Sequence, residues 1–290
     1  MKLSCIVQRE AKLLPILRQE LAMSSTLVKR LKYDRRFLVN GEVVRTNFIV
    51  KPGDLVEVIL DEADPQYLAE ERELSILYED EFLIAIDKPP GMMMHPSPAR
   101  NEGTLANYLL HYYRQTGQPC AVHPVSRLDR DTFGVVLLAK NAHAHGKMHK
   151  QLLEKGIRKL YRAAVVGVPK EPEGLIDAPI ARMREDSLLR CVSPEGKPAR
   201  SRYRVLEEKD GYSLLELEPI TGRTHQLRVH CAYMGFPIAG DPQYGSDALG
   251  LPWQQLCAVS LSFFHPMTGE YTEIFSKQKV SLDFLPSHGV

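Results

Sequence analysis

The stretch HPVSRLDRDTFG at residues 123–134 runs directly into VVLLA at residues 135–139. The first stretch is polar and contains proline and glycine, which predicts a loop, whereas the apolar run predicts a buried strand. Loops held by buried strands are common places for functional sites. Asp129 lies between Arg127 and Arg130, and neighbouring guanidinium groups keep a carboxylate ionised, as a nucleophile or an electrostatic stabiliser requires. The alternative for this stretch is a structural cluster of ion pairs where a strand begins.

Apolar runs on both sides of this loop predict further strands. They lie at residues 74–78, 82–86, 161–168, 201–207, 213–219 and 258–264. Helical spacing of apolar residues predicts helices at residues 104–116 and 142–155. Because strands outnumber helices and do not alternate with them regularly, the sequence predicts an α+β fold with a mixed, mostly antiparallel sheet flanked by helices.

The first sixty residues predict a small separate unit. They contain 11 Lys or Arg and 6 Asp or Glu, whereas residues 61–80 contain 8 acids and one Arg. Serines 24 and 25 are suited to cap a helix with a basic face, and Asn40-Gly41 predicts a hairpin turn. We therefore expect a first domain at residues 1–62, an acidic linker at 63–74 and a second domain at 75–290.

A second candidate site is TGRTHQLRVH at residues 221–230. It predicts a glycine turn followed by a helix that carries Leu227, Cys231 and Met234 on one face. Arginines at such a helix N-terminus suit a phosphate or a carboxylate. The alternative is a helix whose arginines are only solvated.

A third candidate is KLYRA at residues 159–163, which ends a basic run that starts at Lys140. Another basic cluster lies at residues 197–204. Cations bind phosphates and an aromatic ring stacks on an extruded base, so this pattern favours a nucleic-acid partner and a basic cleft. Tyr161 could equally be a core residue.

Several other function classes lack their usual signatures. The net charge of +1 neither demands nor forbids a polyanionic partner. The five cysteines include no C-x-x-C pair, and this spacing argues against a disulfide framework or a zinc knuckle. Free cysteines favour the reducing cytoplasm. No apolar stretch is long enough for a membrane span or resembles a signal peptide. His145 and His149 have no carboxylate ligand nearby, and His123 with Ser126 lacks a hydrolase motif. Glycine-rich nucleotide motifs are also missing, so we expect no metal and no nucleotide cofactor.

Four motifs together resemble the RluA-type family of pseudouridine synthases. In chain order they are DKPPGMMMHP at residues 87–96, SRLDRDTFG at 126–134, KLYRA at 159–163 and TGRTHQLRVH at 221–230. The resemblance covers about residues 74–275. The N-terminal unit separately resembles the α-L RNA-binding domain that is shared with a small-subunit ribosomal protein. The combination is similar to bacterial enzymes that modify large-subunit ribosomal RNA.

The resemblance implies a role for particular residues. Asp129 would be the nucleophile, Arg223 the cation that pairs with it, and Tyr161 the aromatic that stacks on the target base. Arg127 would help to extrude the nucleotide, and Leu227 would form an apolar wall of the pocket. We also expect substrate contacts from three further cations, Arg130, Lys159 and Arg228.

The implied reaction needs no cofactor. The glycosidic bond of uridine breaks, the uracil ring turns, and its carbon 5 joins the anomeric carbon. Asp129 would either attack the sugar or remove a sugar proton. The sequence departs from many family members at Ser126, where they have His, and at Phe133, where they have Ser.

We thus predict a cytoplasmic, monomeric RNA pseudouridine synthase without a cofactor or a membrane partner. Large-subunit ribosomal RNA is the preferred substrate and transfer RNA the alternative. A non-catalytic RNA-binding or ribosome-assembly protein remains open, and a nucleoside-level glycosidase is a weaker possibility.

Overall fold

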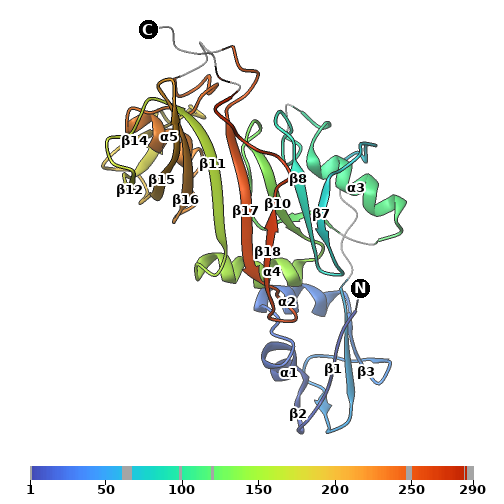
Figure 1. Cartoon of the computed structure of the whole chain (residues 1–290). Helices are drawn as coiled ribbons and strands as arrows, with labels where there is room; N and C mark the ends of the chain where they lie inside the picture. The colour runs from blue at the N-terminus through green and yellow to red at the C-terminus, as the bar shows by residue number, and fades with distance from the viewer. Residues whose placement is uncertain are drawn as a thin grey trace.

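A broad twisted sheet forms the centre of the molecule (Figure 1). The structure is a computed structural model that describes residues 2–60, 67–97, 100–118, 121–245, 250–283 and 285. Within these ranges ten strands join in the order β12-β15-β16-β11-β17-β10-β8-β7, with β18 on β17 and β9 on β10. Strands β10 and β17 run parallel, and the other pairs of this sheet are antiparallel. The predicted α+β fold with a mixed, mostly antiparallel sheet is confirmed.

The strand bounds follow the apolar runs of the sequence closely. They are β7 Ile76–Glu79, β8 Leu83–Lys88, β9 His123–Pro124, β10 Phe133–Ala139, β11 Arg158–Val166, β12 Glu173–Asp177, β15 Arg200–Lys209, β16 Tyr212–Pro219, β17 Leu256–Phe264 and β18 Tyr271–Phe275. A separate two-stranded ribbon, β13 Ile180–Arg182 with β14 Arg190–Val192, lies beyond β12 in the chain. The sequence predicted the long strands, but it did not predict β12, β13, β14 or β18.

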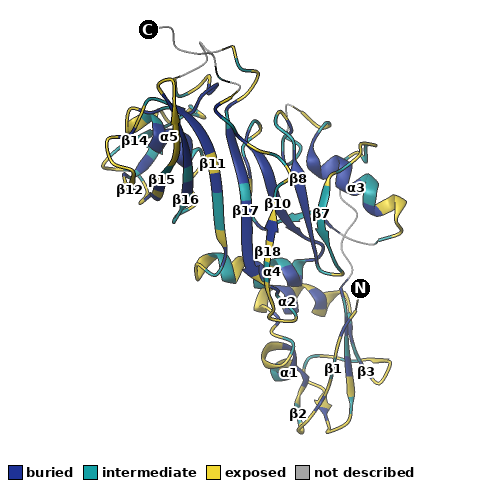
Figure 2. Cartoon of the chain, in the orientation of Figure 1, coloured by how far each residue is buried: buried dark blue, intermediate teal, exposed yellow. Residues whose placement is uncertain are grey.

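The central strands are buried on both faces, as Figure 2 shows for β8 and β10. Alternate residues enter different cores: Ile84 and Val136 face one cluster, and Leu83 and Val135 face the other. Helix α3 (Leu105–Gln115) covers the first cluster, and α4 (Ala142–Leu153) covers the second. Each fully buried aliphatic side chain contributes about 1.5–3 kcal/mol, so these two layers fix the strand that follows the 123–134 loop.

Side-chain caps start α3 and α4 where the sequence changes from loop to apolar spacing. Thr104 and Asn107 form a reciprocal capping box at α3, and Asn141 Oδ1 accepts a hydrogen bond from the backbone N–H of Ala144 at α4. A third helix, α5 (Gln226–Tyr233), contributes Leu227 to the core that α3 also covers. It lies beside the β14–β16 region (Figure 1).

The N-terminal unit has a sheet and a core of its own. Its strands are β1 Lys2–Ile6, β3 Phe37–Val39, β4 Glu42–Val43 and β6 Leu55–Ile59, with a short pair β2 Ala11–Lys12 and β5 Ile49–Val50. Its helices are α1 Leu13–Gln19 and α2 Ser25–Tyr33, the second capped by Ser24. The predicted helix and hairpin are present, and β1 and α1 were not predicted. This core also packs against Phe82 and Ala142, so the unit contacts the starts of β8 and α4.

The predicted acidic linker lies partly outside the described residues, at 63–66. Its second half is attached to α3: Asn107 Nδ2 donates to the carbonyl oxygen of Leu68 at 2.7 Å, and Gly103 N–H donates to Glu70 Oε1 at 2.8 Å. These bonds join this half of the linker to the second domain. No helix among the described residues is long and apolar enough to cross a membrane.

Candidate active site

The loop that carries Asp129 is fixed from below by a buried lysine. Lys88 ends β8 and is fully buried, and its Nζ donates to the carbonyl oxygens of Pro89, Met92 and Arg130 at 2.8–3.0 Å. Burial lowers the pKa of Lys88 to about 7, and the charges of Asp131 and Asp129 oppose that shift. The lysine thus ties two loops together beneath the site.

Gly134 sets the point where this loop joins the sheet. Its φ of +102° lies in a region that side chains avoid, and a Cβ there would lie 2.3 Å from the carbonyl oxygen of Ala258. The glycine allows β10 to approach β17 closely at the parallel pair Gly134↔Ala258. This junction at the centre of the sheet fixes the chain a few residues after Asp129.

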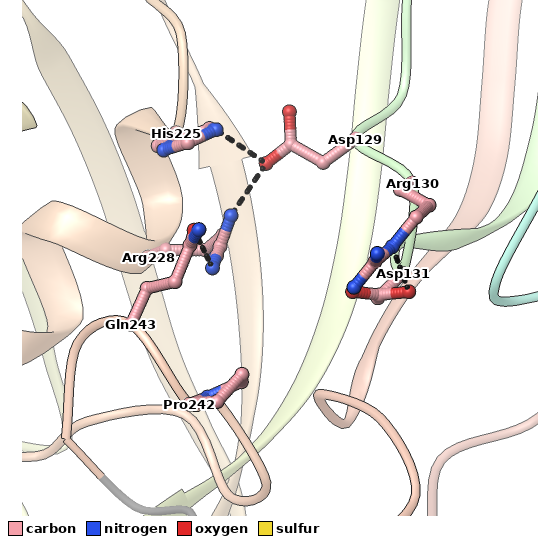
Figure 3. A pocket seen from close by; sticks show the side chains of 7 residues that line it. All are labelled: Asp129, Arg130, Asp131, His225, Arg228, Pro242 and Gln243. Atoms are coloured by element: carbon pink, nitrogen blue, oxygen red, sulfur yellow. Dashed lines mark hydrogen bonds and ion pairs between the residues drawn. The ribbon is translucent and has the colours of Figure 1, made fainter. Parts of the chain in front are cut away.

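Arg228 is the cation that contacts Asp129. Its Nη1 lies 3.2 Å from Asp129 Oδ2 in a hydrogen-bonded ion pair (Figure 3). The guanidinium also binds Asp241 through two hydrogen bonds of 2.7 and 2.8 Å and donates to Gln243 Oε1 at 2.8 Å. Its carbon lies 4.9 Å from the centre of the Tyr244 ring. Burial opposes the charge, but the two carboxylates outweigh it and raise the pKa of Arg228.

His225 approaches the same carboxylate oxygen from the start of α5. Its Nε2 lies 3.9 Å from Asp129 Oδ2, and its Nδ1 lies 2.8 Å from the Tyr244 hydroxyl. Burial lowers the pKa of His225, and the Asp129 charge partly opposes this effect. Every contact found for Asp129 among the described residues ends on Oδ2, and Figure 3 shows Oδ1 turned away from both partners.

The structure corrects the pairing predicted for Arg223. Its side chain is exposed, and its Nε donates to the carbonyl oxygen of Pro198 at 3.0 Å instead of binding Asp129. Arg223 precedes the left-handed residue His225, so it lies outside the helix, whereas Arg228 lies in the first turns of α5 and is buried. Arg228, which we expected only to contact substrate, takes the pairing position.

The aromatic and apolar residues of the prediction share one core cluster, which reaches the residue before Asp129 in the chain. Tyr161, Leu227 and Leu128 are buried in the same cluster. Burial raises the pKa of Tyr161, and the charge of Asp129 adds to this shift. The core alternative for Tyr161 is therefore confirmed by its burial, and its role toward the target base stays a prediction.

The remaining predicted cations lie at the edge of the site or beyond it. Arg130 forms two hydrogen bonds with Asp131 at 2.8 and 2.9 Å, and its side chain is mostly exposed. Arg127 is exposed, and its charge helps burial to lower the pKa of His95. Lys159 is partly buried in β11, where burial lowers its pKa to about 8.

A cavity of about 270 Å³ opens between the loop and α5. It is lined by Asp129, Arg130, Asp131, His225, Arg228, Pro242 and Gln243 (Figure 3). The prediction of a basic cleft is wrong for this cavity, because two carboxylates in its lining balance the two guanidinium groups. Within the described ranges, no three His, Cys, Asp or Glu side chains form a group that could hold a metal ion.

Sequence reasoning missed four of these contributors: His225, Asp241, Gln243 and Tyr244. His225 lies inside a quoted motif and its left-handed conformation is not visible in the sequence. The other three lie after the helix, at residues 241–244, where the pattern shows only a turn-forming Asp-Pro. Asp241 lies 13 residues after Arg228, so no local sequence pattern indicates that these two side chains bind each other.

This arrangement combines one partly exposed carboxylate and a cation fixed beside it, next in the chain to a core cluster that contains Tyr161 and Leu227. A family model described as RNA pseudouridylate synthase matches residues 82–233. The chain belongs to this family. As an RNA pseudouridine synthase it isomerises uridine in RNA, so the non-catalytic and glycosidase alternatives are set aside.

Curated and solved relatives agree with this membership. The uncharacterized RNA pseudouridine synthase YlyB of Bacillus subtilis is 41% identical over 255 residues, which cover 86% of this chain and 84% of that protein. The ribosomal large subunit pseudouridine synthase D of Pseudomonas aeruginosa is 39% identical over 251 residues, which cover 81% and 78%. The structure of human RNA pseudouridylate synthase domain containing 1 is similar with a TM-score of 0.60 and 27% identity, over 71% of this synthase and 84% of the human chain.

Proposed function

We propose that this RNA pseudouridine synthase modifies uridines of large-subunit ribosomal RNA and uses Asp129 as its nucleophile. The observation that carries the proposal is the state of the carboxylate: Asp129 lines the cavity and its Oδ2 is held by Arg228, while Oδ1 makes no hydrogen bond or ion pair among the described residues. A nucleophile needs one oxygen free and a fixed orientation. The ribosomal substrate is supported by the name of the Pseudomonas aeruginosa relative.

The chemistry follows from this geometry. Oδ1 would attack the anomeric carbon of the sugar, or remove a proton from the neighbouring sugar carbon, and in both routes the bond to uracil nitrogen 1 breaks. The detached uracil turns and its carbon 5 bonds to the anomeric carbon. In that step the bond between Oδ1 and the anomeric carbon breaks, or, in the second route, Oδ1 returns the proton to the sugar carbon. The proton on carbon 5 passes to water, and uracil nitrogen 1 takes up a proton from water. Arg228 keeps Asp129 oriented while the charge on its carboxylate changes.

The target nucleotide has to leave its stack before it can reach Asp129. Tyr161 and Leu227 belong to the apolar cluster that also contains Leu128, the residue before Asp129. An aromatic plane beside an apolar wall is suited to hold an extruded base. Arg127 and Arg130 are exposed near the loop and are available to the RNA backbone.

The N-terminal unit would supply further RNA affinity, as an α-L RNA-binding domain does. Helix α2 exposes Lys29, Arg30, Lys32 and, next to them, Tyr33, which is 79% exposed. Cations beside an exposed aromatic ring are suited to bind phosphates and an unstacked base. An RNA substrate and free cysteines are consistent with a cytoplasmic enzyme.

The test is tritium release from RNA that carries tritium on carbon 5 of uracil, prepared from cells that lack this enzyme. Asp129→Asn should release no tritium above background, whereas its RNA dissociation constant should stay within about threefold of wild type, because phosphate contacts carry most of the affinity. Asp186→Asn, at an exposed aspartate far along the chain, is the matched control and should turn over normally. Turnover by Asp129→Asn at the wild-type rate would refute the assigned nucleophile.

A further inference from the structure

His225 adopts a backbone conformation that histidine seldom takes. Its φ of +56° and ψ of 19° lie in the left-handed region, at the residue that precedes α5. Such a conformation costs about 1–2 kcal/mol and persists only where surrounding contacts enforce it. Its side chain makes no cap hydrogen bond to the helix. The ring instead lies between Tyr244 and Asp129, which suggests that the strained turn serves the site.

The contacts of Tyr244 determine which nitrogen of His225 carries the proton. The Tyr244 oxygen accepts a hydrogen bond from the backbone N–H of Arg190 at 2.9 Å, so its own O–H remains available to donate. The acceptor within reach is His225 Nδ1, at 2.8 Å. A neutral ring that accepts at Nδ1 carries its proton on Nε2, and that nitrogen faces Asp129 Oδ2 at 3.9 Å.

The opposite arrangement is less favourable. With the proton on Nδ1, the lone pair of Nε2 would face the Asp129 carboxylate, and the Tyr244 O–H would have to donate elsewhere. An N–H beside a carboxylate is attractive, whereas a lone pair there is repulsive. Burial lowers the pKa of His225, which agrees with a neutral ring.

We propose that His225 is a positioning residue for Asp129: Tyr244 fixes its tautomer, and the Nε2–H then donates to Oδ2 and leaves Oδ1 for the sugar. The distance of 3.9 Å is too long for a hydrogen bond, and catalytic hydrogen bonds of this kind often tighten only when substrate binds. Arg228 and His225 thus hold the same oxygen from two sides. This inference rests on the proposed role of Asp129.

Nitrogen-15 NMR of the full chain labelled in histidine tests the tautomer directly. The His225 signal, assigned by its loss in His225→Asn, should show a protonated Nε2 and an unprotonated Nδ1 near pH 7.5. In Tyr244→Phe the ring loses its donor, so the spectrum should shift toward a mixture of tautomers. A protonated Nδ1 in the wild type, or an unchanged tautomer in Tyr244→Phe, would overturn the proposal.

Kinetics of two amides at position 225 test the consequence for catalysis. The amide nitrogen of glutamine reaches about as far as Nε2, whereas that of asparagine reaches only as far as Nδ1. Asparagine is the residue better suited to a left-handed backbone. We expect His225→Gln to keep kcat within about tenfold and His225→Asn to lose about 100-fold, the cost of misplacing a reacting group by about 1 Å.

The readouts separate a positioning role from a structural one. Both variants should bind the tritium-labelled RNA with the wild-type dissociation constant and should unfold at similar temperatures. If His225→Asn is as active as His225→Gln or more active, then activity depends on the backbone preference of residue 225 and not on a donor at the position of Nε2. That result contradicts the proposal.

The NMR result does not depend on activity. If Asp129→Asn is active but the Nε2–H tautomer is found, the nucleophile assignment has failed. If Asp129→Asn is inactive and the tautomer is Nδ1–H, the His225 proposal alone has failed.

Discussion

Arg228 connects the two carboxylates of the site, and its role can be separated from that of Arg223 by one conservative change. Arg228→Lys keeps the charge, but an ammonium group cannot bridge Asp129 and Asp241 with the planar set of donors that arginine has. We expect kcat to fall by about 100-fold, because Asp129 loses its fixed orientation. Tritium release from RNA is the measurement.

Arg223→Lys is the matched control, because the two arginines lie five residues apart in the same motif. Arg223 is exposed and bound to the carbonyl oxygen of Pro198, so its replacement should leave kcat within about threefold of wild type. A severe loss in Arg223→Lys with little effect in Arg228→Lys would restore the pairing that the resemblance implied.

At this scale the sequence named both residues that the structure pairs, Asp129 and Arg228, but it assigned the pairing to Arg223. Asp129, Arg228, Tyr161 and Leu227 were all named as candidates. The pairing failed because the turn at His225 separates Arg223 from the helix, and a positive φ at a residue other than glycine has no sequence signal. Asp241 was missed because it meets Arg228 only after the chain has reversed beyond α5.

The junction of β10 and β17 depends on a single glycine. Gly134→Ala would place a Cβ against the carbonyl of Ala258 at a φ of +102°, so both steric overlap and backbone strain oppose it. We expect a loss of at least about 3 kcal/mol in the free energy of unfolding. Urea denaturation followed by circular dichroism would measure it.

Gly146→Ala provides the comparison within α4. Gly146 is exposed, its φ is not positive, and nothing lies within 4 Å of a Cβ built there. Because alanine is the better helix former, the variant should be more stable by about 0.5–1 kcal/mol. Equal effects of the two changes would show that the close approach at Gly134 does not limit stability.

Elements with two buried faces or strong helical spacing were predicted well. Strands β8 and β10 are continuous apolar runs, and α3 and α4 combine caps with apolar spacing. Strands β12 and β18 were missed because they lie at sheet edges and bury one residue of five. When a strand has only five residues and most of them are exposed, its alternation of apolar and polar residues does not distinguish it from a loop.

The contact between the N-terminal unit and the sheet domain includes a buried histidine. His143, at the start of α4, helps to line a cleft of about 290 Å³ with Lys2, Glu20, Glu81 and Lys147. Burial, with a smaller effect from Lys147, lowers the pKa of His143 to about 4. Between pH 6.5 and 4 the unfolded chain therefore binds a proton that the folded chain does not bind, so stability falls as the pH falls.

This linkage predicts a pH-dependent difference between two chains. From pH 7 to pH 4.5 the wild type should lose about 2 kcal/mol more than His143→Leu, which has no proton to bind there. Urea denaturation at pH 7, 5.5 and 4.5 would measure the difference. Parallel losses in both chains would mean that other groups account for the acid sensitivity.

The N-terminal unit should contribute to RNA affinity but not to the chemical step. Lys29→Glu with Lys32→Glu should weaken binding and reduce the slope of affinity against salt by about 0.7 for each phosphate contact removed. The rate at saturating RNA should stay near that of wild type. Lys170→Glu with Lys279→Glu, at two exposed lysines of the second domain, controls for the charge change. Unchanged affinity and salt slope in the double variant would contradict an RNA-binding role for α2.

At the scale of the whole chain, composition predicted two units, and in the structure the four-stranded and the ten-stranded sheet belong to separate cores. The sequence did not reveal that the second half of the linker binds α3, because those bonds use backbone groups of Leu68 and Gly103. It also did not reveal the contact of the first unit with Phe82 and Ala142, since no local pattern encodes which surfaces meet.

A map of pseudouridines in total cellular RNA tests the central claim most directly. Carbodiimide labelling and reverse-transcription stops would be compared between cells that carry the wild type, a deletion, or Asp129→Asn at the native locus. We predict that the same sites in large-subunit ribosomal RNA lose pseudouridine in both altered strains. Sites lost only from transfer RNA would contradict the ribosomal substrate, and sites kept in the Asp129→Asn strain but lost in the deletion would contradict the catalytic role of Asp129.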